Sequence, residues 1–384
     1  MILAKHDSSR ILILRGGALG DFILTLPAIR ALRRRWPLAT IELIGHPRMA
    51  DLAVVAGLIN RVRSLDASGM AEWFIPHRAW PVCERDDVAS FELILSYLGD
   101  AAGVVPANLR AAGAKRVIAC SPIVVSGHAA DHFLRPVMEL GGQQRQLYYV
   151  AAAVTPRLST GSTPSPARLQ KLNFPGIAPG IPPPLVVDPL LPWPEALRAQ
   201  GRRRLADLGL TGDVISLHPG SGSLRKNWPV ERFAMLADRV RRSMSARPLF
   251  ILGEADTAAA RELPRLAPTV PVLHNRPLKE VASILAASRG YVGNDSGITH
   301  LAAALGLPTV ALFGPTDATV WGPRGANVVI LQGRAPTSTA LAAIEPDAVL
   351  QALAHGIAVQ GAPPGPSGAC GVQAAAHAKR FFCI

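Results

Sequence analysis

The chain has 384 residues, of which 49% are hydrophobic and 17% are charged, and it contains 34 glycines and 34 prolines. This much apolar material excludes the disordered and fibrous classes of protein and predicts two globular domains. The four cysteines are too few and too scattered for a disulfide scaffold, and they fit a reducing compartment best.

The net charge of +13 is spread evenly along the chain. Up to residue 190 there are 20 basic and 14 acidic residues, and after it there are 20 and 13. Without a basic tail, and without aromatic residues interleaved with basic ones, a nucleic-acid partner is not expected. An evenly basic surface attracts anionic substrates or anionic lipid equally well. The N-terminal residues do not resemble a secretory signal, and no apolar run reaches the length of a membrane span. We therefore expect a cytoplasmic protein that can rest on a membrane surface.

The first part of the chain alternates between short apolar runs and helix-length segments. Residues 11–14 form an apolar run that ends at Gly16 and Gly17, and apolar residues at helical spacing follow as far as Leu32. This pattern predicts a buried strand, a tight turn and a helix. Further strands are expected at residues 41–44, 62–65, 93–95 and 117–119. The alternation predicts a parallel sheet covered on both faces, in a first domain of residues 1–155.

The composition then changes to Pro, Ser, Gly and Thr, which predicts an interdomain linker over residues 156–194. A second α/β domain is expected over residues 195–356. Its strands are expected at 214–217, 249–252, 291–292 and 309–313, and its helices at 229–244, 256–266, 277–287, 297–305 and 346–354. Residues 357–384 lack an amphipathic period and are expected to be a disordered tail.

The turn between the first strand and the first helix reads Arg15-Gly16-Gly17-Ala18-Leu19-Gly20-Asp21. Open α/β sheets bind ligands at this position. A dinucleotide fingerprint fails because Arg15 stands where its first glycine should be, and the chain has no phosphate loop with a GK[ST] ending. The turn therefore marks either a different functional site or a tight turn in which Asp21 caps the helix.

The segment 218–229 follows the first strand of the second domain and reads HPGSGSLRKNWP. Its small residues allow backbone N–H groups to approach a phosphate, and Arg225 and Lys226 add positive charge before a helix that Pro229 can open. The alternative is a solvated basic turn. Trp228, an unusual residue for a loop, and the rarity of lysine in this chain favour the functional interpretation.

Two later turns have similar chemistry. Residues 293–300 read GNDSGITH, in which Asp295 and Ser296 can cap a helix or form part of an anion-binding nest. The local pattern favours His300 as a packed helix residue over a direct ligand. Residues 313–317, FGPTD, could close a pocket or cap the next helix.

Other site classes find no support in the sequence. The cysteines lack CxxC spacing and no HExxH is present, which argues against a zinc site. A GxSxG elbow is also missing, which argues against an α/β-hydrolase.

Taken together, the segments 16–28, 226–229, 293–297 and 313–316 resemble glycosyltransferase family 9, the ADP-heptose:lipopolysaccharide heptosyltransferase family. The resemblance covers about residues 10–356 and implies a GT-B fold, in which two Rossmann-like domains face each other across a cleft. It implies an acceptor site on the first domain and a nucleotide-sugar site on the second.

The resemblance also implies roles for individual residues. Asp21 corresponds to the catalytic base, and Gly17 and Gly20 to the acceptor-side turn. Lys226 corresponds to the phosphate-binding lysine, and Glu254 is placed to meet a ribose. The other residues implied in donor binding are Ser221, Gly222, Asp295, Ser296, Gly297 and His300. Many members carry two hydroxyl residues for the diphosphate, whereas this chain has Ser221 and Gly222.

The chemistry implied by the resemblance is inverting transfer of a heptose or related sugar from an ADP-sugar to a lipopolysaccharide-core or similar glycolipid hydroxyl, without a metal or cofactor. A GT-B transferase that uses a different nucleotide sugar or acceptor stays open within the same fold. Two alternatives from other classes also stay open, a nicotinamide-dependent oxidoreductase and a non-catalytic basic module that binds nucleic acid or membrane. The first is weakened by the failed fingerprint, and the second by the even distribution of charge.

Overall fold

A computed structural model describes residues 9–140, 188–325, 327–333 and 341–361. Most of the expected linker, and the expected tail beyond residue 361, lie outside the described residues.

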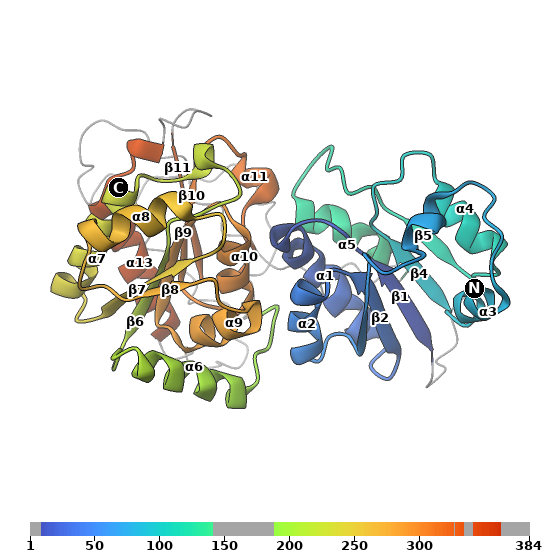
Figure 1. The fold of residues 1–384 in the computed structure, drawn as a ribbon, viewed down its shortest axis with the longest axis horizontal. Coiled ribbons are helices and arrows are strands. Elements are labelled where there is room, and N and C mark those ends of the chain that lie inside the picture. Colours follow the sequence, from blue (N-terminus) through green and yellow to red (C-terminus); the bar gives the residue numbers. More distant parts are fainter. Residues whose placement is uncertain (1–8, 141–187, 326, 334–340, 362–384) are drawn as a thin grey trace, which may run out of the picture.

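The first part of the chain folds around a parallel five-stranded sheet with the order β3-β2-β1-β4-β5 (Figure 1). Its strands are β1 (Arg10–Leu14), β2 (Thr40–Gly45), β3 (Arg61–Ser64), β4 (Leu93–Ser96) and β5 (Val117–Ala119). The helices between and after them are α1 (Leu19–Arg35), α2 (Pro47–Val55), η1 (Met70–Phe74), α3 (Val82–Ala89), α4 (Val104–Ala111) and α5 (Ala129–Glu139).

The second part has a parallel six-stranded sheet with the order β11-β10-β9-β6-β7-β8. Its strands are β6 (Val214–His218), β7 (Arg247–Leu252), β8 (Val272–His274), β9 (Gly290–Asn294), β10 (Thr309–Phe313) and β11 (Val328–Gln332). Its helices are α6 (Glu195–Asp207), η3 (Leu224–Lys226), α7 (Val230–Ser243), α8 (Thr257–Leu266), α9 (Leu278–Ala287), α10 (Gly297–Ala304), α11 (Ala318–Trp321) and α13 (Pro346–Gly361).

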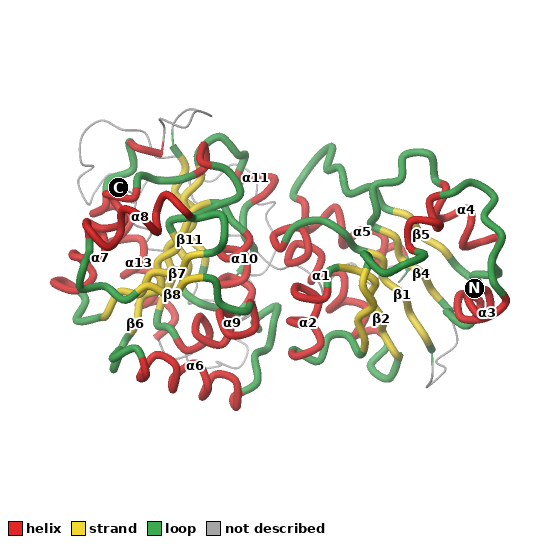
Figure 2. The backbone as a smooth tube through the Cα atoms, viewed as in Figure 1, coloured by secondary structure: helices red, strands yellow, loops and turns green. Residues whose placement is uncertain are grey.

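Helices cover both faces of each sheet, as Figure 2 shows with helices in red on either side of the yellow strands. In β1, Ile11 and Ile13 belong to the core under α1 and α5, whereas Leu12 and Leu14 belong to a second core under η1 and α4. This division follows from the alternation of side chains along a strand. It explains why the strands read as continuous apolar runs rather than as alternating ones.

The expected strands all occur, with ends shifted by no more than two residues. Two further strands, β8 and β11, and the helix α6 were not expected. Both strands lie at sheet edges, and β8 exposes two of its three residues. Its apolar signal is therefore weak. The last helix also continues to Gly361, seven residues beyond the expected end.

The strand order reverses between β1 and β4 in one sheet and between β6 and β9 in the other. Loops that leave the carboxyl ends of such strands form the crevice where open α/β sheets bind ligands. The glycine turn follows β1, and the 218–229 and 295–300 segments follow β6 and β9. All three sequence motifs therefore stand at a reversal point.

The two sheet domains meet through α1 and α2 of the first and α10 and α9 of the second (Figure 1). A second contact joins the start of α5 to the loop after α11, where His128 Nε2 donates to the carbonyl of Gly322 at 2.9 Å. The structure therefore brings the first turn of α1 against the first turn of α10.

Candidate active site

Asp21 is the third residue of α1, directly after the glycine turn. Its Oδ2 accepts a hydrogen bond from the backbone N–H of Ala18 at 3.0 Å, and its side chain is 37% exposed. The bond to Ala18 gives Asp21 a helix-capping contact, as expected for a tight turn in which Asp21 caps the helix. Its Oδ1 accepts no hydrogen bond from the described residues, so one carboxylate oxygen remains free to react.

The two glycines of the turn are fixed by different constraints. Gly17 has φ +93°, and a Cβ there would lie 2.9 Å from Asp21 Oδ2. Gly20 faces the other domain, since a Cβ there would lie 3.4 Å from Cδ2 of His300. The turn therefore needs one glycine for its backbone and one for the approach of the second domain.

The loop after β6 holds Ser221 and Gly222 in a tight turn. Ser221 Oγ lies 2.6 Å from Asn227 Oδ1 and accepts the N–H of Ser223 at 3.2 Å. Gly222 is exposed, and a Cβ there would have nothing within 4 Å. The hydroxyl of Ser221 thus shapes the loop, and position 222 has room for a larger residue.

Lys226 and Asp295 form an ion pair across the reversal point of the second sheet. Lys226 Nζ donates to Asp295 Oδ2 at 2.8 Å, and the side chains are 34% and 8% exposed. The buried carboxylate fixes the end of a long, flexible side chain. The exposed part of the ammonium can still meet an anion.

Trp228 is a core residue and not a ligand platform. It is 1% exposed, packs edge-on against Phe233 at 4.9 Å, and donates Nε1–H to the carbonyl of Ile344 at 3.0 Å. The presence of Trp228 therefore does not support ligand binding by the 218–229 loop. A sequence pattern alone does not distinguish a tryptophan that packs in the core from one that contacts a ligand.

Sequence reasoning missed the part played by Asn294, which joins the two loops. Its buried side chain accepts the N–H of Trp228 at 3.0 Å and donates to the carbonyl of Pro219 at 2.7 Å. The 218–229 loop is therefore fastened at both ends to the end of β9. The only indication of this role in the sequence was the position of Asn294, a polar amide residue, within the 293–300 segment.

The first turn of α10 carries the next group of expected residues. Ser296 is the N-cap and accepts the N–H of Thr299. Gly297 faces the first domain, since a Cβ there would lie 2.7 Å from Leu19 Cβ. The glycine therefore permits the contact between α10 and the start of α1.

His300 is buried between the two domains. Burial has the largest effect on the pKa of its imidazole and lowers it, the carboxylates of Asp295 and Asp21 raise it in part, and Lys226 lowers it; the resulting pKa is about 4. The ring is therefore neutral at pH 7. No hydrogen bond from the described residues reaches its buried Nδ1. The ring packs closely, as the helical pattern predicted, and it also lies within the electrostatic reach of both carboxylates.

Glu254 lies on the exposed turn after β7. Asp256, two residues further on, is buried. It lies against the 218–229 loop, so closely that a Cβ on Gly220 would be 1.7 Å from Asp256 Oδ1. Asp256 Oδ2 accepts the N–H of Gly253 at 2.7 Å and lies 3.9 Å from Nδ1 of the buried His218. Asp256 and His218 therefore pack against the loop, a pairing that no sequence motif indicated.

Of the two interpretations of residues 313–317, the structure favours the cap. Asp317 is the N-cap of α11 and accepts the N–H of Thr319 at 2.8 Å.

Comparison with known proteins finds sequence similarity in the second part of the chain. A sequence model described as "Glycosyltransferase family 9 (heptosyltransferase)" matches residues 191–344. Lipopolysaccharide heptosyltransferase 1 of Pseudomonas aeruginosa is 33% identical over 156 residues, which are 39% of this chain and 43% of that protein. Residues 191–344 are therefore similar to glycosyltransferase family 9.

Solved structures extend the likeness to the whole fold. The family 9 glycosyl transferase from Veillonella parvula superposes with a TM-score of 0.66 at 19% identity, over 94% of this chain and 99% of the other. The E. coli heptosyltransferase WaaC with ADP gives 0.59 at 18%, over 90% and 99%. The fold is therefore GT-B, as expected. By sequence alone, the match to the P. aeruginosa relative spans less than half of that family 9 protein.

Two absences apply to the described part of the chain. Across the described ranges, no three His, Cys, Asp or Glu side chains gather in a way that could hold a metal ion. None of the described helices is long and apolar enough to cross a membrane.

Proposed function

We propose that the chain is an inverting glycosyltransferase that transfers a heptose or related sugar from an ADP-sugar to a hydroxyl of the lipopolysaccharide core or a similar glycolipid. The observation that carries this proposal is the meeting of α1 and α10. It brings the Asp21 carboxylate of one domain and the Lys226–Asp295 pair of the other within electrostatic reach of one buried imidazole, His300.

The relatives support the chemical class. The P. aeruginosa relative is a lipopolysaccharide heptosyltransferase, and the E. coli neighbour was solved with ADP. An ADP-sugar is therefore the first donor to test. The donor would lie over the ends of β6 and β9, with its diphosphate near Lys226 and the first turn of α10.

In the proposed reaction Asp21 is the general base. As the acceptor oxygen attacks the anomeric carbon of the donor sugar, its proton passes to the Asp21 carboxylate. The bond from the anomeric carbon to the diphosphate breaks, and the electron pair leaves with ADP. Oδ1 suits the role because Oδ2 is already engaged by Ala18. A positioned base contributes about 10²- to 10⁴-fold in rate.

The departing diphosphate gains negative charge, which the second domain would stabilise. Lys226 supplies a held ammonium, and the start of α10 supplies backbone N–H groups at the positive end of a helix dipole. The neutral His300 adds no charge and offers a ring nitrogen to a polar group of the donor. Ser221, Gly222, Ser296, Gly297 and Glu254 complete the proposed donor contacts, with Glu254 toward the ribose, and Gly17 and Gly20 shape the acceptor side.

The reaction needs no metal in this proposal, because an ammonium and N–H groups take the place of a cation at the diphosphate. Turnover is expected to persist in excess EDTA. Complete loss of turnover that Mg²⁺ or Mn²⁺ restores would refute metal independence and would leave the roles of Asp21 and Lys226 open to the tests below.

We also propose a cytoplasmic enzyme that works at the inner leaflet, since the net charge of +13 favours anionic lipid. Sedimentation with vesicles of anionic and of zwitterionic phospholipid tests this. Equal recovery with both would remove the lipid contact from the proposal.

The decisive experiment compares Asp21→Asn with Asp21→Ala. Asn keeps the size and can accept from Ala18 but cannot take a proton, so turnover should fall by at least about a hundredfold while ADP affinity and melting temperature stay close to wild type. Asp21→Ala also removes the cap and should cost up to about 2 kcal/mol in the free energy of unfolding. Near-normal turnover in a folded Asp21→Asn variant would remove Asp21 as the base.

A further inference from the structure

Arg15 is an almost fully buried cation directly beneath the glycine turn. Its side chain is 3% exposed, and its guanidinium lies 4.4 Å from the centre of the Phe133 ring. An arginine in such a place remains charged at neutral pH, even though burial lowers its pKa. Burying a charge is costly unless other groups compensate for it, so the partners of Arg15 define its role.

Those partners join the turn to the neighbouring strand. Nη2 donates to the backbone carbonyl of Asp21 at 3.0 Å, and Nη1 lies 3.4 Å from the carbonyl of Tyr97, directly after β4. The Tyr97 hydroxyl in turn donates to the carbonyl of Phe133 on α5 at 2.9 Å. The guanidinium therefore fixes the first turn of α1 against both β4 and α5.

The same guanidinium stands beside the carboxylate of Asp21. Nη2 lies 3.8 Å from Asp21 Oδ1, and no other carboxylate of the described residues comes within 4 Å of Arg15. This separation is too long for a hydrogen bond. The positive charge therefore balances the carboxylate and leaves Oδ1 free to accept a proton.

We propose that Arg15 is a positioning residue for the base, which holds the backbone and the charge of Asp21 in place without contacting the substrate. This inference rests on the proposed function of Asp21. It explains why a large cation stands where a nucleotide-binding turn would carry glycine. A displacement of a reacting group by about 1 Å can cost up to about a hundredfold in rate, so loss of this support should appear in kcat.

The test compares Arg15→Met and Arg15→Lys with wild type, using ADP-heptose as donor and a lipopolysaccharide-core acceptor. Calorimetric titration with ADP gives the fraction of functional sites and the ADP affinity. In Arg15→Met, kcat per functional site should fall roughly ten- to a hundredfold, while the KM for ADP-heptose and the Kd for ADP stay within about twofold of wild type. Arg15→Lys keeps the charge but lacks the two-pronged geometry, and it should recover part of the lost kcat.

Arg33→Met is the matched control. Arg33 lies in the last turn of α1, the helix that carries Asp21 near its start. It donates to the backbone carbonyls of Leu58, Pro37 and Ala39. Its loss should lower the melting temperature and leave kcat per functional site unchanged.

Three results would overturn the proposal. The first is an unchanged kcat per functional site in Arg15→Met, or in Arg15→Lys if the Met variant does not fold. The second is a loss of ADP affinity that matches the loss of turnover, which would make Arg15 a donor ligand. The third is a lysine variant no better than methionine. If Asp21→Asn is inactive while Arg15→Met is fully active, the proposed function stands and only this inference fails.

Discussion

The ion pair of Lys226 with Asp295 stabilises the resting site and also binds the proposed donor. Asp295 is 8% exposed, and a carboxylate buried to that extent destabilises the fold when its partner is removed. A lysine substitution will therefore change both stability and binding. The two effects must be separated before either is interpreted.

We predict that Lys226→Ala weakens ADP binding by about ten- to a hundredfold, because a charge-assisted hydrogen bond contributes on the order of 1.5 to 3 kcal/mol. It should also lower the melting temperature. The double variant Lys226→Ala/Asp295→Asn should regain melting temperature but not ADP affinity. Arg225→Ala, an exposed basic neighbour, is the control for general charge. Unchanged ADP affinity by calorimetry in Lys226→Ala would remove the lysine from the donor site.

At the scale of elements, the contact between α1 and α10 assembles the proposed site from two domains. Leu19, Gly20, Gly297 and His300 make this contact, and two of the four are glycines. A side chain at either glycine position would act on the distance between the helices and not on the chemistry of the site.

We predict that Gly297→Ala lowers turnover more than it lowers the melting temperature, because its Cβ would lie within 3.1 Å of three side-chain atoms of Leu19 and would push the helices apart. Steady-state kinetics and thermal melting measure the two effects. Gly356→Ala in α13 is the matched control, since the nearest atom to a Cβ there, Pro308 Cβ, is 3.5 Å away. Equal turnover in both variants would show that the spacing of the helices does not limit the reaction.

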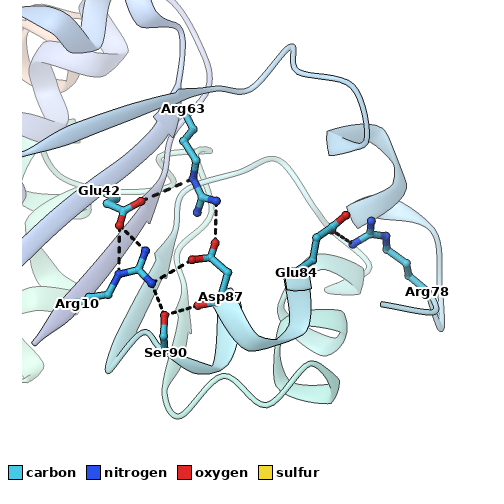
Figure 3. A network of polar contacts seen from close by, with 7 residues as sticks. All are labelled: Arg10, Glu42, Arg63, Arg78, Glu84, Asp87 and Ser90. Carbon is cyan, nitrogen blue, oxygen red and sulfur yellow. Dashed lines mark hydrogen bonds and ion pairs between the residues drawn. The ribbon is translucent and has the colours of Figure 1, made fainter. Parts of the chain in front are cut away.

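A network of ion pairs joins three strands and one helix of the first domain (Figure 3). Glu42 of β2 lies between Arg10 of β1 and Arg63 of β3, and both arginines also reach Asp87 of α3. The Glu42 side chain is 3% exposed, and the arginines are about one-third exposed. The network ties three strands to one helix, away from the proposed site.

We predict that Glu42→Gln lowers the free energy of unfolding by about 1 to 3 kcal/mol, because two partly buried cations lose their shared partner and water screens part of the loss. ADP affinity should not change. Glu84→Gln, at the pair with Arg78 in Figure 3, should cost no more than about 1 kcal/mol. Glu84 is 39% exposed, and the buried Arg78 keeps Glu72 as a second partner. Chemical denaturation measures both variants, and equal losses would contradict the ranking by burial.

At the scale of the whole molecule, two buried histidines make the assembly of the domains sensitive to acid. Burial lowers the pKa of His128 and of His300 to about 4. His128 Nδ1 accepts from the N–H of Ala130 and from Arg324 Nε, so its protonation would break both bonds. Because the folded pKa lies below the unfolded value of 6.5, the neutral forms stabilise the fold above pH 6.5. This stability is lost as the pH falls from about 6.5 to 4.

We predict that His128→Asn, which keeps a helix-capping acceptor and removes the titration, reduces the fall in melting temperature between pH 7.5 and pH 5. The comparison with wild type cancels the contribution of carboxylates that titrate in the same range. An identical pH dependence in the two proteins would contradict the assignment of His128 as an acid-sensitive contact.

The order of the elements and the positions of the motifs could be predicted from the amino-acid sequence. Unbroken apolar runs such as residues 11–14 and 309–313 can only be strands buried on both faces, and the glycine turn, the lysine loop and the 295–300 segment follow such strands directly. Because parallel strands share one carboxyl edge, this placement predicts a ligand crevice in each domain. The edge strand β8 escaped prediction because it has only three residues and two of them are exposed. The edge strand β11 begins with four apolar residues and is largely buried, so its signal was present in the sequence and our prediction missed it.

The contacts between side chains distant in the sequence could be established only from the folded structure. The packing of Trp228 in the core, the joining of two loops by Asn294 and the position of Arg15 beneath Asp21 all depend on partners that are distant in the sequence. The contact of Gly20 with His300 depends on how two domains dock. A local sequence pattern depends on residues that are neighbours in the chain. These contacts instead depend on how separate helices and strands pack, which a local pattern does not contain.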